Sequence, residues 1–330
     1  MGTKIKTIEK IIADINFVGK SLISINDVAD GQIYGLFDLA LALEPWNRSR
    51  TELLYGNNMV TLFYQPSTRT RMSFETAMLR MGGTVVSEPN PLISSSAAKE
   101  ESLNDSMRVV SQYANIIVLR HPDADEAEEG AAYSECPVIS GGFGHREHPT
   151  QALLDLYTIY RTFGRIEGLN ICVASPDLIK ARTGHSMAQG LARLGANVHL
   201  ASTKRHRTPD SVMDSIHKVT DSVQEHFDLN NRQFNELSGE MDLVYLPGCC
   251  TPAGAESEAF KEIMDDYRLN YETVHDSFEN GHALYVTHTL PRREGEMDLR
   301  IDSSRGELMF KAIAYSVSIR SALITAILGV

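Results

Sequence analysis

Short apolar runs alternate with amphipathic helical segments along most of the chain, and this alternation constrains the fold more than any other feature. It is typical of α/β proteins, in which parallel strands are buried between layers of helices. The runs that predict strands lie at residues 58–64, 84–86, 115–119, 137–140, 170–174, 197–201, 242–246 and 283–286. The segments that predict helices lie at residues 26–42, 69–81, 102–113, 150–163, 183–194 and 306–328.

The length of the chain predicts how these elements are divided. A chain of 330 residues exceeds the roughly 150 residues of one ordinary domain, so we expect two α/β domains, each a parallel sheet flanked by helices. We expect the first to comprise residues 1–150 with the last helix, 306–330, and the second to comprise residues 151–305. The polar stretch 204–240 shows the weakest pattern.

Composition excludes several classes of partner. With 42% hydrophobic and 22% charged residues, the chain has the balance of a soluble globular protein. Its 31 basic and 43 acidic residues give a net charge of −12, which disfavours nucleic acid and requires a local positive pocket for any anionic ligand. No uninterrupted apolar run approaches the roughly 18 residues of a membrane span, and the N-terminus lacks a secretory signal. The cysteines predict reduced thiols because no CxxC pair occurs. We therefore expect a cytoplasmic protein without membrane or nucleic-acid partners.

The segment from Phe63 to Arg71, FYQPSTRTR, carries the strongest chemical signal. A buried strand leads here into a helix N-terminus, where unpaired N–H groups and the helix dipole favour an anion. Ser and Thr hydroxyls add donors, and arginine matches the geometry of phosphate oxygens. An ordinary helix cap with solvated arginines is the alternative. Five consecutive donors favour a phosphate site.

At this segment the sequence resembles the aspartate/ornithine carbamoyltransferase family, and most closely its aspartate carbamoyltransferase catalytic chains. The matching segments, in the order and spacing of the family, are SINDVAD (24–30), QPSTRTRMSFETAMLRMGG (65–83), VLRHPD (118–123), EHPTQALLDLYTI (147–159) and HTLPR (288–292). The resemblance implies an enzyme that transfers the carbamoyl group of carbamoyl phosphate to an amine. It also implies a homotrimer, or an assembly of trimers, with active sites at the subunit interfaces.

The resemblance assigns roles to individual positions. Those implied to bind carbamoyl phosphate are Ser67, Thr68, Arg69, Thr70, Lys99, Arg120, His148, Gln151, Leu290 and Pro291. Those with implied catalytic roles are Arg69, Thr70, Arg120, His148 and Lys99. Thr70, Arg120 and His148 would stabilise charge on the carbonyl oxygen, and Lys99 would reach into the neighbouring subunit's site.

Each of these residues also has a simpler interpretation. His148, which precedes a proline, has the alternative role of a capping or core histidine. For Arg120 the alternative is a surface arginine at the end of a strand, and for Lys99 it is a lysine in a mobile loop. Only their joint match to one family favours the functional roles.

The site for the second substrate departs from the family pattern. Arg182 matches the arginine that holds the α-carboxylate of aspartate, but Gly248 and Cys250 stand where aspartate-specific members have an arginine and a glutamine. Losing a bidentate arginine from a carboxylate site costs about 2–5 kcal/mol. The residues able to replace that charge are Lys180, Arg292 and Arg293. The loop signatures of ornithine-specific members are absent as well.

We therefore expect a small amino-acid-like acceptor that has one carboxylate and is not aspartate. Aspartate carbamoyltransferase activity is the first alternative, and a non-catalytic homologue that binds phosphate or a partner is the second. No cofactor and no metal are expected. Cys249 and Cys250 lack partner ligands, and the segment His145–His148 lacks the i, i+4 histidine pair of a zinc motif.

Overall fold

A computed structural model describes residues 2–46, 49, 51–248, 263–293 and 295–330. Contacts between residues divide the chain into two compact units, Met1–Leu154 with Tyr315–Val330, and Asp155–Ala314. These boundaries fall four and nine residues later than those expected from the sequence, at 150 and 306, because each lies inside a continuous helix. The helices concerned are α7 (Pro149–Phe163) and α13 (Met309–Leu328).

The first unit is built on a four-stranded parallel sheet with the strand order β2-β1-β3-β4. Its strands are β1 (Asn58–Phe63), β2 (Thr84–Glu88), β3 (Ile116–His121) and β4 (Val138–Phe143). Its helices are α1 (Gly2–Ile15), α2 (Asp30–Leu43), α3 (Arg69–Arg80), α4 (Pro91–Ser94), α5 (Leu103–Ser111) and α6 (Ala124–Ala132). The short 3₁₀ turns are Ile25–Asp27, Glu44–Trp46 and Ser96–Lys99.

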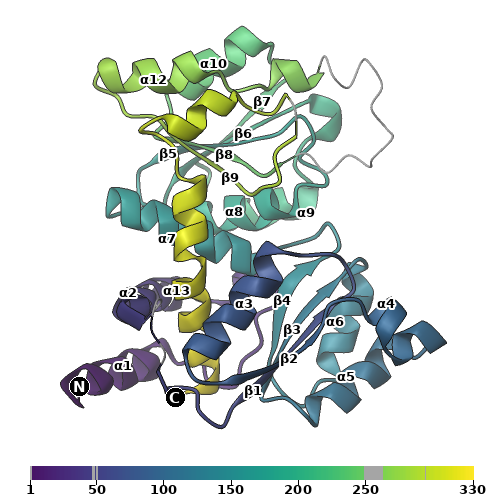
Figure 1. Cartoon of the computed structure of the whole chain (residues 1–330). Helices are drawn as coiled ribbons and strands as arrows, with labels where there is room; N and C mark the ends of the chain where they lie inside the picture. Colours follow the sequence, from purple (N-terminus) through teal and green to yellow (C-terminus); the bar gives the residue numbers. More distant parts are fainter. Residues whose placement is uncertain (1, 47–48, 50, 249–262, 294) are drawn as a thin grey trace. The chain divides into compact units, whose positions relative to one another are not determined.

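Alternate side chains of β1 cover opposite faces of this sheet, as the period of a strand requires. Val60 and Leu62 join the buried cluster that includes Leu103 and Met107 of α5. Thr61 points the other way and donates to the Glu75 carboxylate of α3 at 2.9 Å. Helix α3 therefore lies on one face of the sheet, and α5 and α6 lie on the other (Figure 1).

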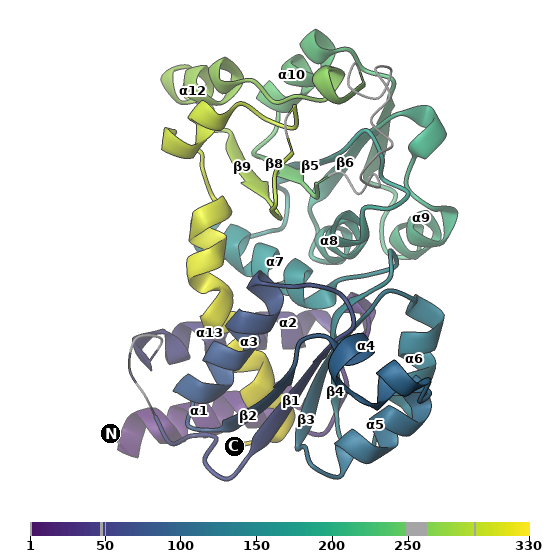
Figure 2. The same cartoon turned by 45° about the vertical axis from the view of Figure 1, so that its right-hand side comes forward.

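The second unit is built on a five-stranded parallel sheet with the order β7-β6-β5-β8-β9. Its strands are β5 (Asn170–Ala174), β6 (Asn197–Ser202), β7 (Val223–Phe227), β8 (Leu243–Leu246) and β9 (Tyr285–His288). Its helices include α8 (Arg182–Arg193), α9 (Asp210–His217), α10 (Asn231–Gly239) and α12 (Tyr271–Glu279), and its 3₁₀ turns are Lys204–His206 and Leu299–Ser303. Helices α8 and α9 cover one face of this sheet, and α10 and α12 cover the other (Figure 2).

The predicted class, two parallel sheets flanked by helices, is confirmed, with local differences. Strand β4 continues through Gly141 and Gly142 instead of ending at Ser140. Glycine permits this, because a Cβ at Gly141 would lie only 3.2 Å from the carbonyl oxygen of Leu119. The helix expected from residue 26 is a 3₁₀ turn capped by Ser24, and α2 begins at Asp30. Within 204–240 the structure contains α9, β7 and α10.

Helix α13 is the one described helix that is long and apolar enough in composition to cross a membrane. Of its most apolar window, 67% is buried inside the protein. A helix buried in a protein core has the same length and apolar composition, so these two properties do not identify α13 as a membrane span.

Candidate active site

The carboxyl ends of three neighbouring strands of the first unit meet at one edge of the sheet, where open parallel sheets bind ligands. Arg120, at the end of β3, pairs in register with Phe63 of β1, and its carbonyl accepts the N–H of Tyr64 at 2.9 Å. Its guanidinium donates to the Gly141 carbonyl of β4 at 3.3 Å. Arg120 is half-buried, and this hydrogen bond directs its guanidinium from the end of β3 toward β4.

The segment after β1 forms the start of α3. Thr68 is the N-cap residue, Arg69 is the first helical residue, and Thr70 is buried. Arg69 is exposed overall, but desolvation of its guanidinium lowers its pKa, and the side chain stays cationic because the ordinary pKa of arginine lies far above neutral pH. Arg71 instead bonds to Glu75 at 3.0 Å. Ser67 to Thr70, four of the five consecutive donors, thus lie at this helix end.

His148 lies beside this helix start. Its Nε2 is 3.3 Å from Oγ1 of Thr70, and its Nδ1 is 3.4 Å from Oγ1 of Thr150. The residue is buried, and its carbonyl accepts the N–H of Gln151 at 3.0 Å, which places Gln151 in the first turn of α7. His148 therefore begins a helix, as its simpler interpretation holds, and also presents its ring to Thr70.

Lys99 ends the 3₁₀ turn Ser96–Lys99 and is exposed. The next residue, Glu100, adopts a left-handed conformation with φ of 66°. Glu101 accepts a hydrogen bond from Ser106 at 2.7 Å, which secures the loop to the start of α5.

In the second unit, one carbonyl oxygen joins two loops. The carbonyl of Pro247, after β8, accepts Oγ1–H of Thr183 at 3.3 Å and Oγ1–H of Thr289 at 2.8 Å. Thr183 follows Arg182, the first residue of α8. Gly248 has a φ of +76°, a conformation that favours glycine. Cys250 lies outside the described residues.

The loop after β9 is held by a buried histidine. Nδ1 of His288 accepts the N–H of Leu290 at 2.8 Å, so in the neutral ring Nε2 carries the proton and donates to Glu296 at 2.9 Å. Leu290 has a φ of +53° and precedes Pro291. Arg292 bonds to Asp302 at 2.9 Å, so its charge is directed to that carboxylate.

Two buried polar residues of the second unit, Tyr245 and Asp155, were not predicted from the sequence. Oη–H of Tyr245, on β8, donates to the Asp155 carboxylate of α7 at 2.8 Å, and both side chains are buried. Burial, and then the charge of Asp155, hold the pKa of Tyr245 well above its usual value. The available signal was an acidic residue amid the apolar stretch ALLDLYTI of the expected helix.

Comparison with known proteins explains this arrangement. A model of the aspartate/ornithine carbamoyltransferase carbamoyl-P binding domain matches residues 20–161, and a model of the family's Asp/Orn binding domain matches residues 167–327. The chain belongs to the aspartate/ornithine carbamoyltransferase family. It is a carbamoyltransferase, and the expected enzyme class is confirmed.

Individual relatives cover nearly the whole carbamoyltransferase chain. A ureidoglycine carbamoyltransferase of Rubrobacter xylanophilus is 60% identical over 98% of this chain and 96% of its own. The aspartate transcarbamoylase of Trypanosoma cruzi in complex with carbamoyl phosphate superposes with a TM-score of 0.85, at 28% identity, over 96% of this chain and 98% of that one. The catalytic subunit of M. jannaschii aspartate transcarbamoylase superposes with a TM-score of 0.80, at 34% identity, over 94% and 99%.

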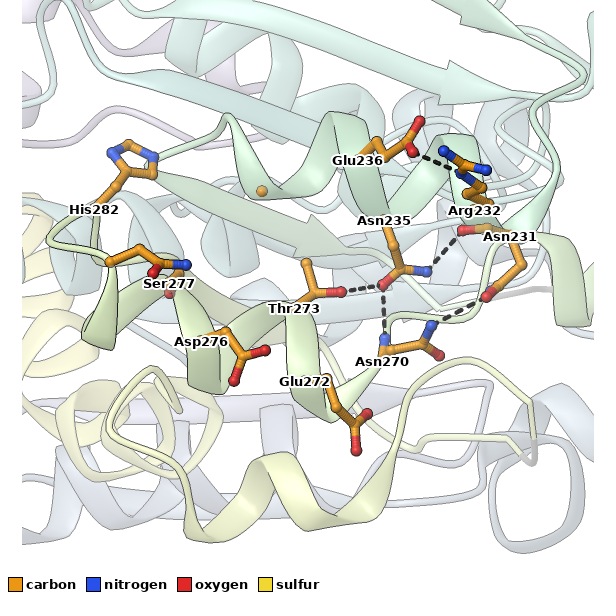
Figure 3. A pocket seen from close by; sticks show the side chains of 12 residues that line it. Asn231, Arg232, Asn235, Glu236, Asn270, Glu272, Thr273, Asp276, Ser277 and His282 are labelled. Carbon is orange, nitrogen blue, oxygen red and sulfur yellow. Dashed lines mark hydrogen bonds and ion pairs between the residues drawn. The ribbon is translucent and has the colours of Figure 1, made fainter.

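A polar groove elsewhere on this carbamoyltransferase lies between α10 and α12 (Figure 3). Its asparagines bond to one another and to the backbone, since Asn235 accepts Asn270 N–H at 2.9 Å and Thr273 Oγ1–H at 2.7 Å. Asn270 donates to the side chain of Asn231 at 3.0 Å. This network fastens the chain before α12 to α10 and is structural. Across the described ranges, no group of three or more His, Cys, Asp or Glu is placed to hold a metal ion.

Proposed function

We propose that this protein transfers the carbamoyl group of carbamoyl phosphate to the amino group of ureidoglycine, an α-amino acid that carries a neutral ureido group. The name of the 60% identical relative supports this acceptor, and so does Gly248, which stands where aspartate-specific members are expected to have an arginine. Arg182, at the start of α8, remains to bind the single carboxylate. The position without a side chain at residue 248 is the observation that carries the proposal.

The proposed reaction needs no nucleophilic side chain. The lone pair of the acceptor amine attacks the carbonyl carbon, and the new C–N bond forms a tetrahedral intermediate. The C–O bond to phosphate then breaks, phosphate leaves with the electron pair, and one of its oxygens takes a proton from the nitrogen. In this proposal Thr70, Arg120 and His148 stabilise the negative charge on the carbonyl oxygen. The 3.3 Å approach of Thr70 to His148 supports that arrangement.

The remaining residues bind the two ends of carbamoyl phosphate. We assign the phosphate to Ser67, Thr68 and Arg69 at the α3 N-terminus, with Lys99 supplied by a neighbouring subunit. We assign the carbamoyl NH₂ to Gln151, in the first turn of α7. The proposed division is a first domain that binds carbamoyl phosphate and a second that binds the acceptor.

The shared lysine implies a homotrimer, and we propose this assembly. Lys99 supports it, because an exposed cation at the end of a short turn is able to reach another chain. The proposed location is the cytoplasm, which the free thiols of Cys136 and Cys172 support.

Turnover with a panel of acceptors tests the function. The purified protein is mixed with carbamoyl phosphate and ureidoglycine, aspartate or ornithine, and phosphate release and the carbamoylated product are both measured. We expect product with ureidoglycine and a much lower kcat/KM with the other two. A higher kcat/KM with aspartate would overturn the acceptor assignment. Binding of a phosphonate mimic without turnover of any amine would favour the non-catalytic alternative.

A further inference from the structure

The carboxylate of Glu296 is held in a fixed orientation in the second unit. One of its oxygens, Oε2, accepts Nε2–H of His288 at 2.9 Å and the backbone N–H of Arg293 at 2.6 Å. His288 is itself fixed by the N–H of Leu290 on its other nitrogen. Glu296 is only 7% exposed, so these bonds orient a carboxylate that is largely removed from water.

The other oxygen of Glu296 faces the divergent position 248. A Cβ built on Gly248 would lie 3.9 Å from Oε1 of Glu296 and 3.4 Å from Cε1 of His288. Gly248 and Glu296 line one small pocket together with Ser175 and Tyr267. A side chain attached at residue 248 would therefore begin beside this carboxylate.

The chemistry of this position differs from that of an aspartate-specific site. An arginine at residue 248 would stand beside Glu296 and offer donors to a second carboxylate of the acceptor. Gly248 adds no donor, and Oε2 of Glu296 already accepts two hydrogen bonds, so a second carboxylate placed here meets another carboxylate and no partner of opposite charge. A ureido group is neutral and offers N–H donors to a carboxylate.

We propose that Glu296 determines acceptor specificity by accepting N–H groups of the acceptor's ureido substituent and by repelling a second carboxylate. This inference rests on the proposed function. It assigns Glu296 a role in acceptor binding, in addition to its structural bonds with His288 and Arg293.

Two dead-end ligands separate these effects. Ureidoacetate has the carboxylate and ureido group but no amine, and succinate has two carboxylates and no amine. Their inhibition constants are measured against ureidoglycine turnover in the wild type, in Glu296→Gln and in Glu296→Asp. Glu272→Gln is the control, since Glu272 is an exposed carboxylate that bonds to Arg300 in the same unit.

In Glu296→Gln we expect the inhibition constant of ureidoacetate to rise about 10- to 100-fold, because a charge-assisted hydrogen bond is lost. That of succinate should stay constant or fall, because the like charge is removed. Glu296→Asp should weaken ureidoacetate binding and still disfavour succinate. Glu272→Gln should change neither constant.

Equal changes for both ligands would overturn the inference, because a purely structural role for Glu296 affects every acceptor alike. Unchanged inhibition constants would overturn it as well.

Affinity for inorganic phosphate, measured by calorimetry, should stay constant in every variant that folds. If Glu296→Gln fails to fold, the Glu296→Asp variant tests the inference. Equal weakening of ureidoacetate and succinate binding in that variant would overturn the proposed role of Glu296 in specificity. Failure of the proposed function is distinguishable, because the wild type itself would then not turn over ureidoglycine.

Discussion

Nε2 of His148 lies 3.3 Å from Oγ1 of Thr70, although 78 residues separate them in the chain. The contact joins the start of α3 to the start of α7 inside the first unit, and both side chains are buried. Two hydrogen-bonding groups that converge in this way are placed to act on one ligand oxygen, where charge develops during the proposed reaction.

Thr70→Val tests the role of that hydroxyl with little change in volume. We expect kcat to fall about 10²- to 10³-fold, because one donor to the carbonyl oxygen is lost. The free energy of unfolding should decrease by only about 1 kcal/mol. Steady-state kinetics and urea unfolding provide the two measurements. Arg71→Gln is the matched control, since Arg71 bonds to Glu75 and its loss should leave kcat near that of the wild type. A Thr70→Val enzyme within threefold of wild-type kcat would exclude the proposed role.

The shared active site is testable by mixing two inactive variants. Lys99→Ala and His148→Ala should each lose most activity, and trimers assembled from both should regain part of it. The reason is that some interfaces in a mixed trimer then combine an intact Lys99 with an intact His148. Activity is measured after the separately purified variants are dissociated and reassembled together. Full activity of Lys99→Ala alone would contradict a shared site.

The pair formed by His199 on β6 and His226 on β7 should make stability depend on pH. Nδ1 of His199 lies 3.0 Å from Nε2 of His226, so one ring must donate and the other accept. Burial lowers the pKa of both rings, the charge of His226 lowers that of His199 further, and Glu240 opposes the shift. As pH falls below the ordinary histidine value of about 6.5, the unfolded chain binds protons before the folded one.

The free energy of unfolding should therefore decrease as the pH falls below about 6.5 and through the folded pKa values. His226→Gln removes one titrating ring and should make this decrease smaller. Urea unfolding between pH 5 and pH 8, about the range in which histidine titrates, measures the effect. His275→Gln, at an exposed site on α12, is the control and should preserve the wild-type slope. An unaltered slope in His226→Gln would show that other groups dominate.

Cys172 should be inert in the folded protein. It is fully buried on β5, and burial raises its pKa to about 12. The thiolate is the reactive form, so alkylation at pH 8 requires unfolding. Peptide mass spectrometry after iodoacetamide treatment should find Cys172 unmodified in native protein and modified in denaturant. Native labelling at the rate of the half-buried Cys136 would contradict this.

Elements with continuous apolar runs were predictable from the sequence, and those without them were not. Strand β1 is an apolar run buried on both faces, and the prediction for it ended within one residue of the observed end. Strand β7 (VQEHF) lies at the sheet edge with only part of its surface buried, so its pattern is weak. Helices α9 and α10 are short and carry many polar residues.

The candidate site divides in the same way. Ser67 to Thr70 lie within one local motif, whose residue types alone indicate an anion. The bond from Tyr245 to Asp155 joins residues 90 positions apart, and Glu296 acquires its orientation only from His288 and Arg293. Such partners are set by tertiary packing, which periodicity along a single chain does not encode.

The carbonyl oxygen of Pro247 has a consequence for how such enzymes diverge. The hydroxyls of Thr183 and Thr289 both donate to this backbone oxygen. These hydrogen bonds do not involve the side chain of the following residue, 248. These two bonds hold the loops on either side of residue 248, whose own φ of +76° favours the glycine found there. A change of acceptor within this fold is then able to leave both loop attachments in place.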